Sequence, residues 1–305
     1  MRKIRPGLIV TVLICIMEVV FWKEVVSTAA IGIMVIRGQP RHCPLGRMVG
    51  SYAATTDQLR GVGRIKASAR LIKREAAGYD LYDLAAQRVW VPSGSLSGAI
   101  DDTAEQERGI YDYDGSFPRA GAVVLDGGAN IGLYARHALR RGASKVVAIE
   151  PVPANLECLR RNLEEEILAG KVVLYPKGVW DKDGILEMSL NPENHMADSF
   201  VLNQQKGISM KLPLTTIDKL VEELHLQRVD LIKLDIEGAE RQALSGAKNT
   251  IRKFRPKLAV CVYHLPDDTA VIPAVIRSIR SDYRQGCGAC MFFEYTIRPQ
   301  VYFYF

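Results

Sequence analysis

Short apolar runs alternate with longer amphipathic segments through the second half of the chain, and this pattern predicts its secondary structure. Apolar runs of strand length occur at residues 122–126, 145–150, 171–175, 229–235 and 257–263. Segments with a helical spacing of apolar positions follow them, at residues 130–141, 153–166, 216–226, 239–253 and 267–281. Continuous apolar runs are typical of strands buried on both faces of a parallel sheet. We therefore predict an α/β fold, a Rossmann-like sheet with helices on both faces.

Two stretches depart from this alternation. Residues 185–190 and 208–212 are apolar segments on either side of a polar loop, which predicts a hairpin inserted into the fold. Residues 291–298 and 301–305 flank a Pro-Gln turn at the end of the chain. They predict a C-terminal antiparallel hairpin at the edge of the sheet.

The sequence that precedes the sheet is less regular. Residues 38–60 contain many Gly, Pro, Ser and Thr residues, a composition typical of a linker. The pattern predicts a helix at about 65–77, a short strand at 88–92 and a second helix at 103–113. We divide the chain into three parts: an apolar segment (1–37), a basic linker and helix (38–84) and the main domain (85–305).

The N-terminus has the longest apolar stretch of the chain. Residues 7–22 and 25–36 are mostly apolar, and Lys23-Glu24 separates them. A membrane-spanning helix needs about 20 apolar residues, and neither piece reaches that length alone. Four interpretations follow: an imperfect membrane anchor, a signal-like segment, amphipathic helices lying on a membrane, and buried helices of a larger fold. We expect residues 7–36 to associate with a membrane, because basic residues flank them on both sides.

Charge is distributed unevenly along the sequence. Residues 1–75 contain 13 Lys and Arg but 4 Asp and Glu, an excess of nine positive charges. The whole chain has a net charge of +6, so the remaining residues are negative by three. A main domain with this charge is a poor candidate for nucleic-acid binding, whereas a basic N-terminal arm fits the surface of a membrane.

A glycine turn follows the first predicted strand of the sheet. Gly127-x-Ala129-x-x-Gly132 nearly matches the dinucleotide-binding fingerprint, and glycines there let a ligand approach the main chain. The next strand ends in Glu150, the position at which an acid binds ribose hydroxyls in such folds. Asp126, directly before the glycines, would repel a pyrophosphate but would attract the sulfonium and amino group of S-adenosylmethionine. The turn therefore favours S-adenosylmethionine over NAD, although Asp126 could also cap the following helix.

Polar residues stand at the carboxyl ends of the predicted strands, where ligands bind in open parallel sheets. Strand alternation places Lys233, Asp235 and Glu237 on one face of their strand, and His264 ends another strand. A carboxylate beside a lysine stays ionised and is able to accept a proton. Asp235 and His264 are therefore the candidate bases, and the alternative is a purely structural ion-pair cluster.

Three motifs in this order resemble the FkbM family of S-adenosylmethionine-dependent methyltransferases. They are Leu125–Gly132, Glu150–Asn155 and Lys233–Glu240, and Tyr263–Asp268 is a further match. The similarity extends from about Glu105 to the C-terminus. It implies a Rossmann-like class I methyltransferase fold that acts on a hydroxyl oxygen of natural products, sugars or surface glycans. Val262 departs from many members of that family, which have Glu two residues before the histidine.

The motifs and the resemblance together define the predicted site. Trp180 and Asp181 follow the third strand, where the adenine ring lies in this fold, and Asp198-Ser199 is a candidate acceptor contact. Glu240 opens a helix, where a carboxylate also favours the helix dipole. The predicted catalytic residues are Asp235, His264, Lys233 and Glu237. The predicted cofactor-binding residues are Asp126, Gly127, Gly128, Asn130, Gly132, Glu150, Pro151, Trp180 and Asp181.

The six cysteines give little sign of a metal centre. Cys287 and Cys290 form the one close pair, and a zinc site would have to recruit Cys43 or His264. Cys158 and Cys261 fall in apolar helix and strand patterns, where buried free thiols are common. We predict no metal site and a reduced domain that faces the cytosol, where S-adenosylmethionine is made.

These observations predict a membrane-associated methyltransferase that uses S-adenosyl-L-methionine. The expected acceptor is a hydroxyl oxygen of a sugar, glycan, lipid-linked or natural-product molecule. Two alternatives remain at this point. The first is a non-catalytic scaffold with the same fold. The second is an NAD-dependent oxidoreductase, which Asp126 and the predicted C-terminal hairpin disfavour.

Overall fold

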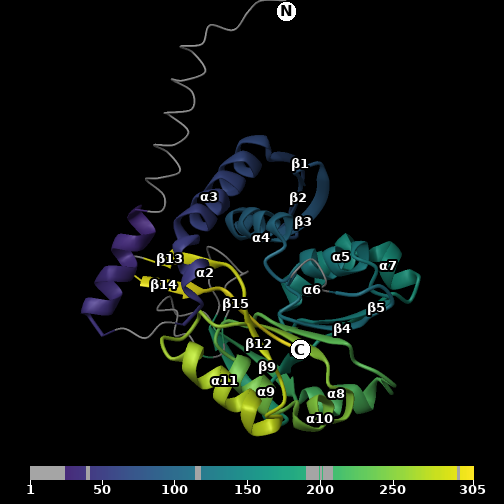
Figure 1. Cartoon of the computed structure of the whole chain (residues 1–305). Helices are drawn as coiled ribbons and strands as arrows, with labels where there is room; N and C mark the ends of the chain where they lie inside the picture. The colour runs from purple at the N-terminus through teal and green to yellow at the C-terminus, as the bar shows by residue number, and fades with distance from the viewer. Residues whose placement is uncertain are drawn as a thin grey trace, which may run out of the picture.

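A seven-stranded sheet forms the centre of the computed structural model, which describes residues 25–38, 42–113, 118–189, 199, 201, 209–293 and 296–305 (Figure 1). The strand order is β12-β15-β11-β10-β4-β5-β6. Strands β11, β10, β4, β5 and β6 are parallel, and β15 runs antiparallel between β11 and β12. The strands are β4 (Val123–Gly127), β5 (Lys145–Ile149), β6 (Val172–Tyr175), β10 (Leu231–Leu234), β11 (Lys257–Cys261), β12 (Gln285–Cys287) and β15 (Val301–Tyr304). The predicted Rossmann-like α/β sheet is confirmed.

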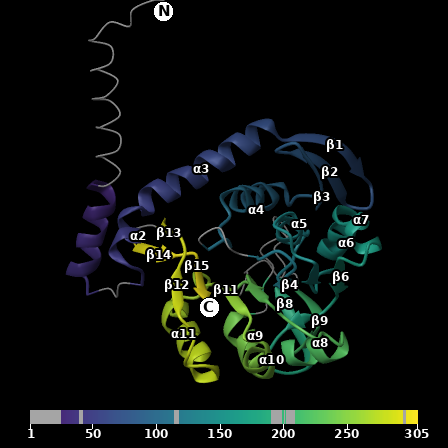
Figure 2. The ribbon, with the colours of Figure 1, turned by 45° about the vertical axis from the view of Figure 1, so that its right-hand side comes forward.

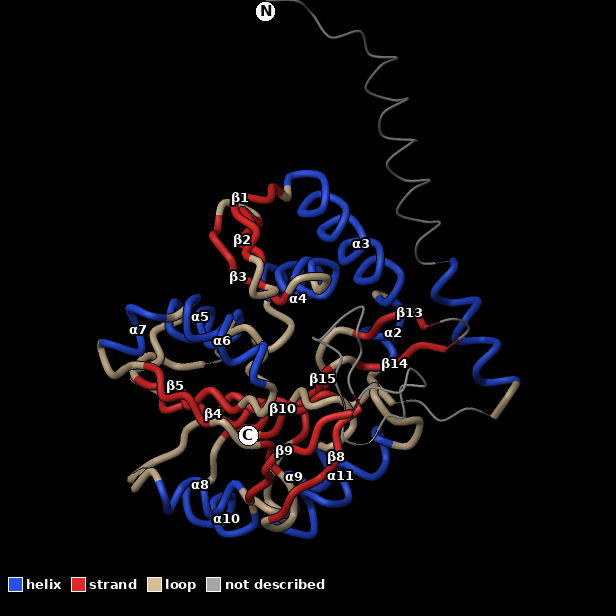
Figure 3. The backbone as a smooth tube through the Cα atoms, turned by 180° about the vertical axis from the view of Figure 1, so that it is seen from behind, coloured by secondary structure: helices blue, strands red, loops and turns tan. Residues whose placement is uncertain are grey.

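Helices cover both faces of this sheet (Figure 3). One face has α5 (Leu133–Arg140), α6 (Pro153–Asn162) and α7 (Glu164–Leu168). The other has α8 (Ile217–Glu223), α9 (Glu240–Ser245), α10 (Lys248–Phe254) and α11 (Asp268–Ile279). Neighbouring strand residues enter opposite cores, as Val124 packs with the α5 side and Leu125 with the α8–α11 side. Both faces of each strand are therefore buried, which explains the continuous apolar runs.

Two of the predicted helices are each divided in two. Residues 153–166 form α6 and α7, and residues 239–253 form α9 and α10. The second break occurs at Gly246, where an added Cβ would lie 2.0 Å from the main-chain oxygen of Trp180. This close approach of two backbone segments requires glycine at the break.

The hairpin predicted between the third and fourth strands is confirmed. Strands β8 (Gly184–Ser189) and β9 (Ser209–Thr215) pair antiparallel, and β7 (Gly178–Val179) joins β9 in parallel. Apart from residues 199 and 201, the predicted polar loop between β8 and β9 lies outside the described residues.

The C-terminal strands pair differently from the prediction. Strand β15 pairs with β12, so residues 285–287 rather than 291–298 are its antiparallel partner at the sheet edge. Strands β13 (Cys290–Phe293) and β14 (Thr296–Pro299) form a separate hairpin that packs against α3. The sequence showed two strands around the Pro-Gln turn but gave no sign that β15 inserts between β11 and β12.

Residues 45–108 form a layer of their own, here called the N-terminal layer. It contains α2 (Leu45–Val49), α3 (Ser51–Ser68), β1 (Arg70–Glu75), β2 (Tyr79–Leu84), β3 (Gln87–Pro92) and α4 (Leu96–Arg108). Strands β1 to β3 form an antiparallel sheet, and α3 extends from the β13–β14 hairpin across α4 to β1 (Figure 2). Ile65, Val91 and Ile100 of this layer share a buried core with Ile131 and Cys158 of the sheet domain.

The N-terminal layer corrects two predictions and confirms one. The linker predicted at 38–60 is wrong, because α2 and most of α3 occupy it, and the helix predicted at 65–77 is instead the end of α3 and β1. Within α3, the hydroxyls of Thr55 and Thr56 donate to carbonyl oxygens of the preceding turn, so the polar groups that suggested a linker are satisfied within the helix. The short strand predicted at 88–92 is confirmed as β3.

Residues 25–36 form a helix with one face on the protein. Ser27 accepts a hydrogen bond from the backbone N–H of Tyr52, and Met34 is buried against Ile297. On its other face Val35 is 58% exposed and Ile36 87% exposed. The described residues include no helix that is both long and apolar enough to span a membrane. Residues 1–24 lie outside the described part of the chain, so the predicted membrane segment remains a prediction.

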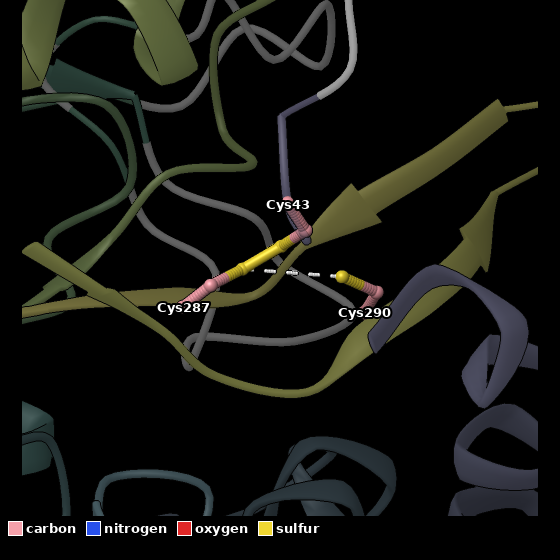
Figure 4. A group of neighbouring side chains, drawn as sticks. All are labelled: Cys43, Cys287 and Cys290. Atoms are coloured by element: carbon pink, nitrogen blue, oxygen red, sulfur yellow. Dashed lines mark hydrogen bonds between the residues drawn. A yellow bond between two sulfur atoms is a disulfide. The ribbon is translucent and has the colours of Figure 1, made fainter. Parts of the chain in front are cut away.

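A disulfide ties the segment after this helix to the edge of the sheet. Cys43 bonds to Cys287 of β12, with Cα atoms 6.0 Å apart and a sequence separation of 244 residues (Figure 4). The third sulfur, of Cys290, lies 4.0 Å from that of Cys287. The prediction of reduced cysteines is therefore wrong for Cys43 and Cys287, because only the fold brings them together. Cys158 and Cys261 are buried free thiols, as expected.

Candidate active site

A cavity of about 240 Å³ opens at the carboxyl ends of β4, β5 and β10. Its wall combines the glycine turn after β4, the loop after β5, the end of β10 and one face of α4. Ligands in open α/β sheets bind at this edge, where strand ends and helix starts present polar groups.

The glycine turn approaches the end of β10 closely. Gly128 lines the cavity and has a φ of 73°, and an added Cβ would lie 1.9 Å from the main-chain oxygen of Asp235. Gly127 and Gly132 serve packing instead. Their added Cβ atoms would each meet a leucine side chain at 2.8 Å, that of Leu234 and Leu163 respectively. Of the three predicted glycines, Gly128 is the one on the cavity wall.

Glu150 is fixed in place by groups of the loops that follow β4 and β5. Its carboxylate accepts hydrogen bonds from the backbone N–H of Asn130 at 3.0 Å and of Val152 at 2.9 Å. The side-chain amide of Asn155 lies 3.4 Å from the same carboxylate. Glu150, Pro151 and Asn130 all line the cavity, and the buried side-chain oxygen of Asn130 has no hydrogen-bond partner among the described residues. As the sequence predicted, these three residues lie together at one edge of the sheet, and their role in cofactor binding remains a prediction.

Asp126 lies behind the cavity wall. Its side chain is fully buried, and the register of β4 and β10 sets it beside Lys233, whose Nζ is 3.1 Å away. Lys233 also donates to the carbonyl oxygens of Gly127 and Gly128. Burial raises the pKa of Asp126, although the lysine charge opposes this rise. Asp126 therefore acts on the turn through Lys233, and Lys233 is the member of the pair that reaches the cavity.

Four ionisable residues meet where β10 and β11 end. The Nε2 atom of His264 lies 3.3 Å from Asp235 Oδ1 and 3.7 Å from Glu237 Oε1, and its Nδ1 atom lies 2.9 Å from Glu240 Oε1. The hydroxyl of Tyr111 donates to the other oxygen of Asp235. Glu237 has a φ of 53°, an uncommon backbone conformation that often occurs at functional sites. The sequence had placed Asp235, Glu237 and His264 at this edge but treated Glu240 as a helix start.

The charges of this cluster are mutually stabilised. Burial alone would raise the pKa of Asp235, but contact with His264 and the charge of Lys233 hold it below its usual value. Burial alone would lower the pKa of His264, but Glu240 and Asp235 raise it well above its usual value. Asp235 therefore favours its carboxylate form and is the better candidate base of the pair.

The N-terminal layer supplies a part of the wall that the sequence did not reveal. Asp101, Asp102 and Glu105 of α4 line the cavity. Burial, followed by the charge of Asp235, raises the pKa of Asp102 to about 8, and burial also raises that of Glu105. The one sequence signal was the spacing of these acids on a single helix face.

Other predicted residues fall away from the cavity. Gly178 and Val179 line it, whereas Trp180 does not and instead donates its backbone N–H to Thr215 of β9. Asp181 is likewise absent from the cavity wall as described. Ser199 donates to the main-chain oxygen of Glu237, and Asp198 lies outside the described residues.

Comparison with known proteins places this geometry in a family. Residues 126–284, more than half of the chain, match the model of the Methyltransferase FkbM domain. Methyltransferase 1 of Beauveria bassiana is 29% identical over 150 residues, which are 41% of this chain and 58% of that protein.

Two further relatives have more descriptive names. The 2-O-methyltransferase NoeI of Sinorhizobium fredii is 28% identical over 151 residues, 44% of this chain and 60% of that protein. The 31-O-demethyl-FK506 methyltransferase FkbM of Streptomyces tacrolimicus is 26% identical over 192 residues, 53% of this chain and 72% of that protein. The matches to Methyltransferase 1 and to NoeI cover less than two thirds of those proteins.

Proposed function

The chain belongs to the FkbM methyltransferase family, and from this premise we propose that it transfers a methyl group from S-adenosylmethionine to a hydroxyl oxygen. The proposed acceptor is a sugar, a glycan, a lipid-linked molecule or a natural product. The observation that best supports this proposal is the fixed carboxylate of Glu150 beside the Gly128 turn, at the end of adjacent parallel strands.

The donor set around the turn fits S-adenosylmethionine. Glu150 offers carboxylate oxygens of the kind that bind ribose hydroxyls, and the unpartnered oxygen of Asn130 offers an acceptor for an ammonium or hydroxyl group. Gly128 allows the turn to pack closely on the end of β10 and so to line the cavity. When bound, S-adenosylmethionine supplies a methyl group on a positively charged sulfur. The carboxylates around the cavity favour such a cation and disfavour a pyrophosphate.

The end of β10 suits the binding of an acceptor hydroxyl. The carboxylate of Asp235 stands at the cavity wall, between the hydroxyl of Tyr111 and the Nε2 atom of His264. It is able to accept the hydrogen bond of an acceptor hydroxyl and so orient the attacking oxygen. Methyl transfer depends strongly on such positioning, because two bound reactants must be aligned. NoeI is named as a 2-O-methyltransferase, and FkbM is named as a methyltransferase of 31-O-demethyl-FK506. Both names support oxygen as the target.

Membrane association and a cytosolic location are also proposed, on separate grounds. The exposed apolar side chains of Val35, Ile36 and Leu45 lie close in sequence to Arg37 and Arg47, a combination that suits an anionic lipid surface. The cellular supply of S-adenosylmethionine supports the cytosolic location. The Cys43–Cys287 disulfide favours an oxidising environment instead, so counting free thiols in protein taken directly from cells tests the location.

Calorimetry tests the cofactor, and product mass tests the reaction. We expect the purified chain to bind S-adenosylmethionine and its demethylated product, and to bind NAD at least tenfold more weakly. Incubation with methyl-labelled cofactor and sugar, glycan or lipid extracts should label an acceptor. Binding without label transfer to any acceptor would favour a non-catalytic scaffold. Binding of NAD with no heat from S-adenosylmethionine would show that the proposal is wrong.

A further inference from the structure

We propose that Asp235, Glu237 and His264 form a binding site for a divalent metal ion next to the cofactor pocket, and that the ion positions the acceptor hydroxyl. This inference rests on the proposed methyltransferase function for its purpose. The metal site itself is argued from geometry that is independent of the cofactor.

The three side chains converge on one point from two strand ends. One ligand atom of each, Asp235 Oδ1, Glu237 Oε1 and His264 Nε2, lies within 4.8 Å of the other two. The two distances from Nε2 are 3.3 Å and 3.7 Å. An octahedral ion with ligands at about 2.1 Å separates neighbouring ligand atoms by roughly 3 Å. Only a small adjustment of side chains would therefore complete the three-residue site.

The surroundings of His264 match those of a metal-binding imidazole. Its side chain is 3% exposed, and its Nε2 atom faces the carboxylates of Asp235 and Glu237. On the opposite side of the ring, Nδ1 lies 2.9 Å from Glu240, which is fully buried. Glu240 is itself fixed by the backbone N–H of Ile236. A carboxylate that holds the distal N–H of a histidine orients the ring and makes it a stronger ligand.

The balance of charge at the cavity also favours a cation. Among the described residues, one lysine, Lys233, lines the cavity. Six carboxylates line the same cavity: Asp101, Asp102, Glu105, Glu150, Asp235 and Glu237. Protons offset part of this excess, because burial raises the pKa of Asp102 and Glu105, and a cation would offset the remainder. A divalent ion between Asp235 and Glu237 would provide two charges at the point where the carboxylates are closest to His264.

The ligand types indicate which ion is expected. Two carboxylates and one imidazole, with room for water or an acceptor oxygen, suit Mg²⁺ or Mn²⁺ better than a thiolate-preferring metal. A hydroxyl bound to such an ion loses its proton more readily than a free one. The ion would thus activate the acceptor hydroxyl for attack on the methyl group.

Manganese binding to the whole purified chain tests the site. We expect one Mn²⁺ ion per chain by calorimetry and electron paramagnetic resonance, and competition by Mg²⁺. Glu237→Gln should weaken Mn²⁺ binding at least tenfold, and this side chain is exposed enough for the variant to fold. Glu240→Gln should weaken it by about 10- to 100-fold through the orientation of His264. Asp101→Asn is the matched control, since this acid lines the same cavity outside the three-residue site, and it should leave Mn²⁺ affinity within twofold.

Separate readouts distinguish this inference from the proposed function. S-adenosylmethionine affinity is measured in the presence of a chelator, and thermal unfolding verifies that each variant folds. Cofactor binding without any Mn²⁺ binding at millimolar concentration would overturn the metal site and leave the proposed function intact. Equal loss of Mn²⁺ affinity in Asp101→Asn and Glu237→Gln would also overturn it, because it would indicate diffuse attraction by the acids. Mn²⁺ binding without cofactor binding would contradict the proposed function alone.

Discussion

The two sides of the active-site cavity are built in different ways. The side proposed to bind the cofactor, here the cofactor side, consists of strand ends and a glycine turn, so the positions of Gly128 and Glu150 follow from a parallel sheet. The other side is α4 of the N-terminal layer, whose acids reach the cavity because a separate small sheet and α3 hold the helix there. The cofactor side is therefore positioned by the sheet itself, whereas the α4 side, here proposed to face the acceptor, depends on how an added layer packs.

The difference is also visible in how each side is stabilised. The sheet side contains the buried Asp126–Lys233 pair, whose partners are adjacent in register across two strands. The N-terminal layer is joined by an apolar core around Ile65, Leu84 and Ile100, while the segment before it is held by the Cys43–Cys287 disulfide. Five changes to the chain test whether the two sides of the cavity differ in this way, and the change with the largest expected effect is given first.

Removal of Lys233 should produce the largest loss of stability. Lys233→Met leaves Asp126 as an unpaired buried acid, and breaking a buried ion pair in this way costs about 3–5 kcal/mol in the free energy of unfolding. Denaturant titration measures the loss. The double variant Asp126→Asn with Lys233→Met is the control and should recover part of it. A single variant as stable as the parent would show that the pair does not hold β4 to β10.

Loss of the disulfide should produce the second largest loss of stability. Cys43→Ser removes a link that closes a 244-residue separation, and loss of a disulfide typically costs about 2–5 kcal/mol. The same denaturant titration applies. Cys290→Ala is the matched control, because Cys290 is a free buried thiol, and it should cost less. Thiol titration of the unfolded parent should find four free thiols among the six cysteines, and six would contradict the disulfide.

The cofactor side is tested by the carboxylate of Glu150. Glu150→Gln should weaken S-adenosylmethionine binding by about 1–3 kcal/mol, the usual range for a hydrogen bond to a charged group. Calorimetry measures it. Glu157→Gln, on α6 and outside the cavity wall, should leave cofactor affinity unchanged. Equal affinities for the parent and Glu150→Gln would remove this carboxylate from the cofactor site.

The acceptor side is tested by Asp102 of α4. Asp102→Asn should raise the KM for the acceptor or lower kcat by about tenfold, roughly 1.4 kcal/mol, while cofactor affinity changes by less than threefold. Steady-state kinetics and calorimetry give the two values. A parallel loss of cofactor affinity would mean that the contact of Asp102 with Asn130 joins the two sides into one site.

Removal of residues 1–24 should have the smallest effect on the folded domain. Residues 25–36 must be kept, because Ser27 and Met34 pack on the protein. The truncated chain should bind S-adenosylmethionine with an affinity within twofold of the parent and should no longer sediment with vesicles that contain anionic lipid. A truncated chain that still sediments with them would place the membrane contact elsewhere. A truncated chain that aggregates would support the buried-helix interpretation.

Local sequence patterns were enough to predict the parallel sheet and the strand ends that line the cavity. Continuous apolar runs predict strands buried on both faces, and polar residues at their ends must meet at one edge because parallel strands point the same way. Glu150, Asp235 and His264 were placed at that edge for this reason. The glycines of the turn were identified because only residues without a side chain permit such a close approach.

The remaining features depend on tertiary packing and could not be predicted from local patterns. The segment predicted as a linker became α2 and α3 because packing outweighs a weak local preference. Three features join groups that are far apart in the sequence or lie on different elements. They are the acids of α4 at the cavity wall, the Cys43–Cys287 disulfide, and the contact of Glu240 with His264. Local patterns reveal which face of an element is buried, whereas the partner across that face is set by the packing of the whole chain.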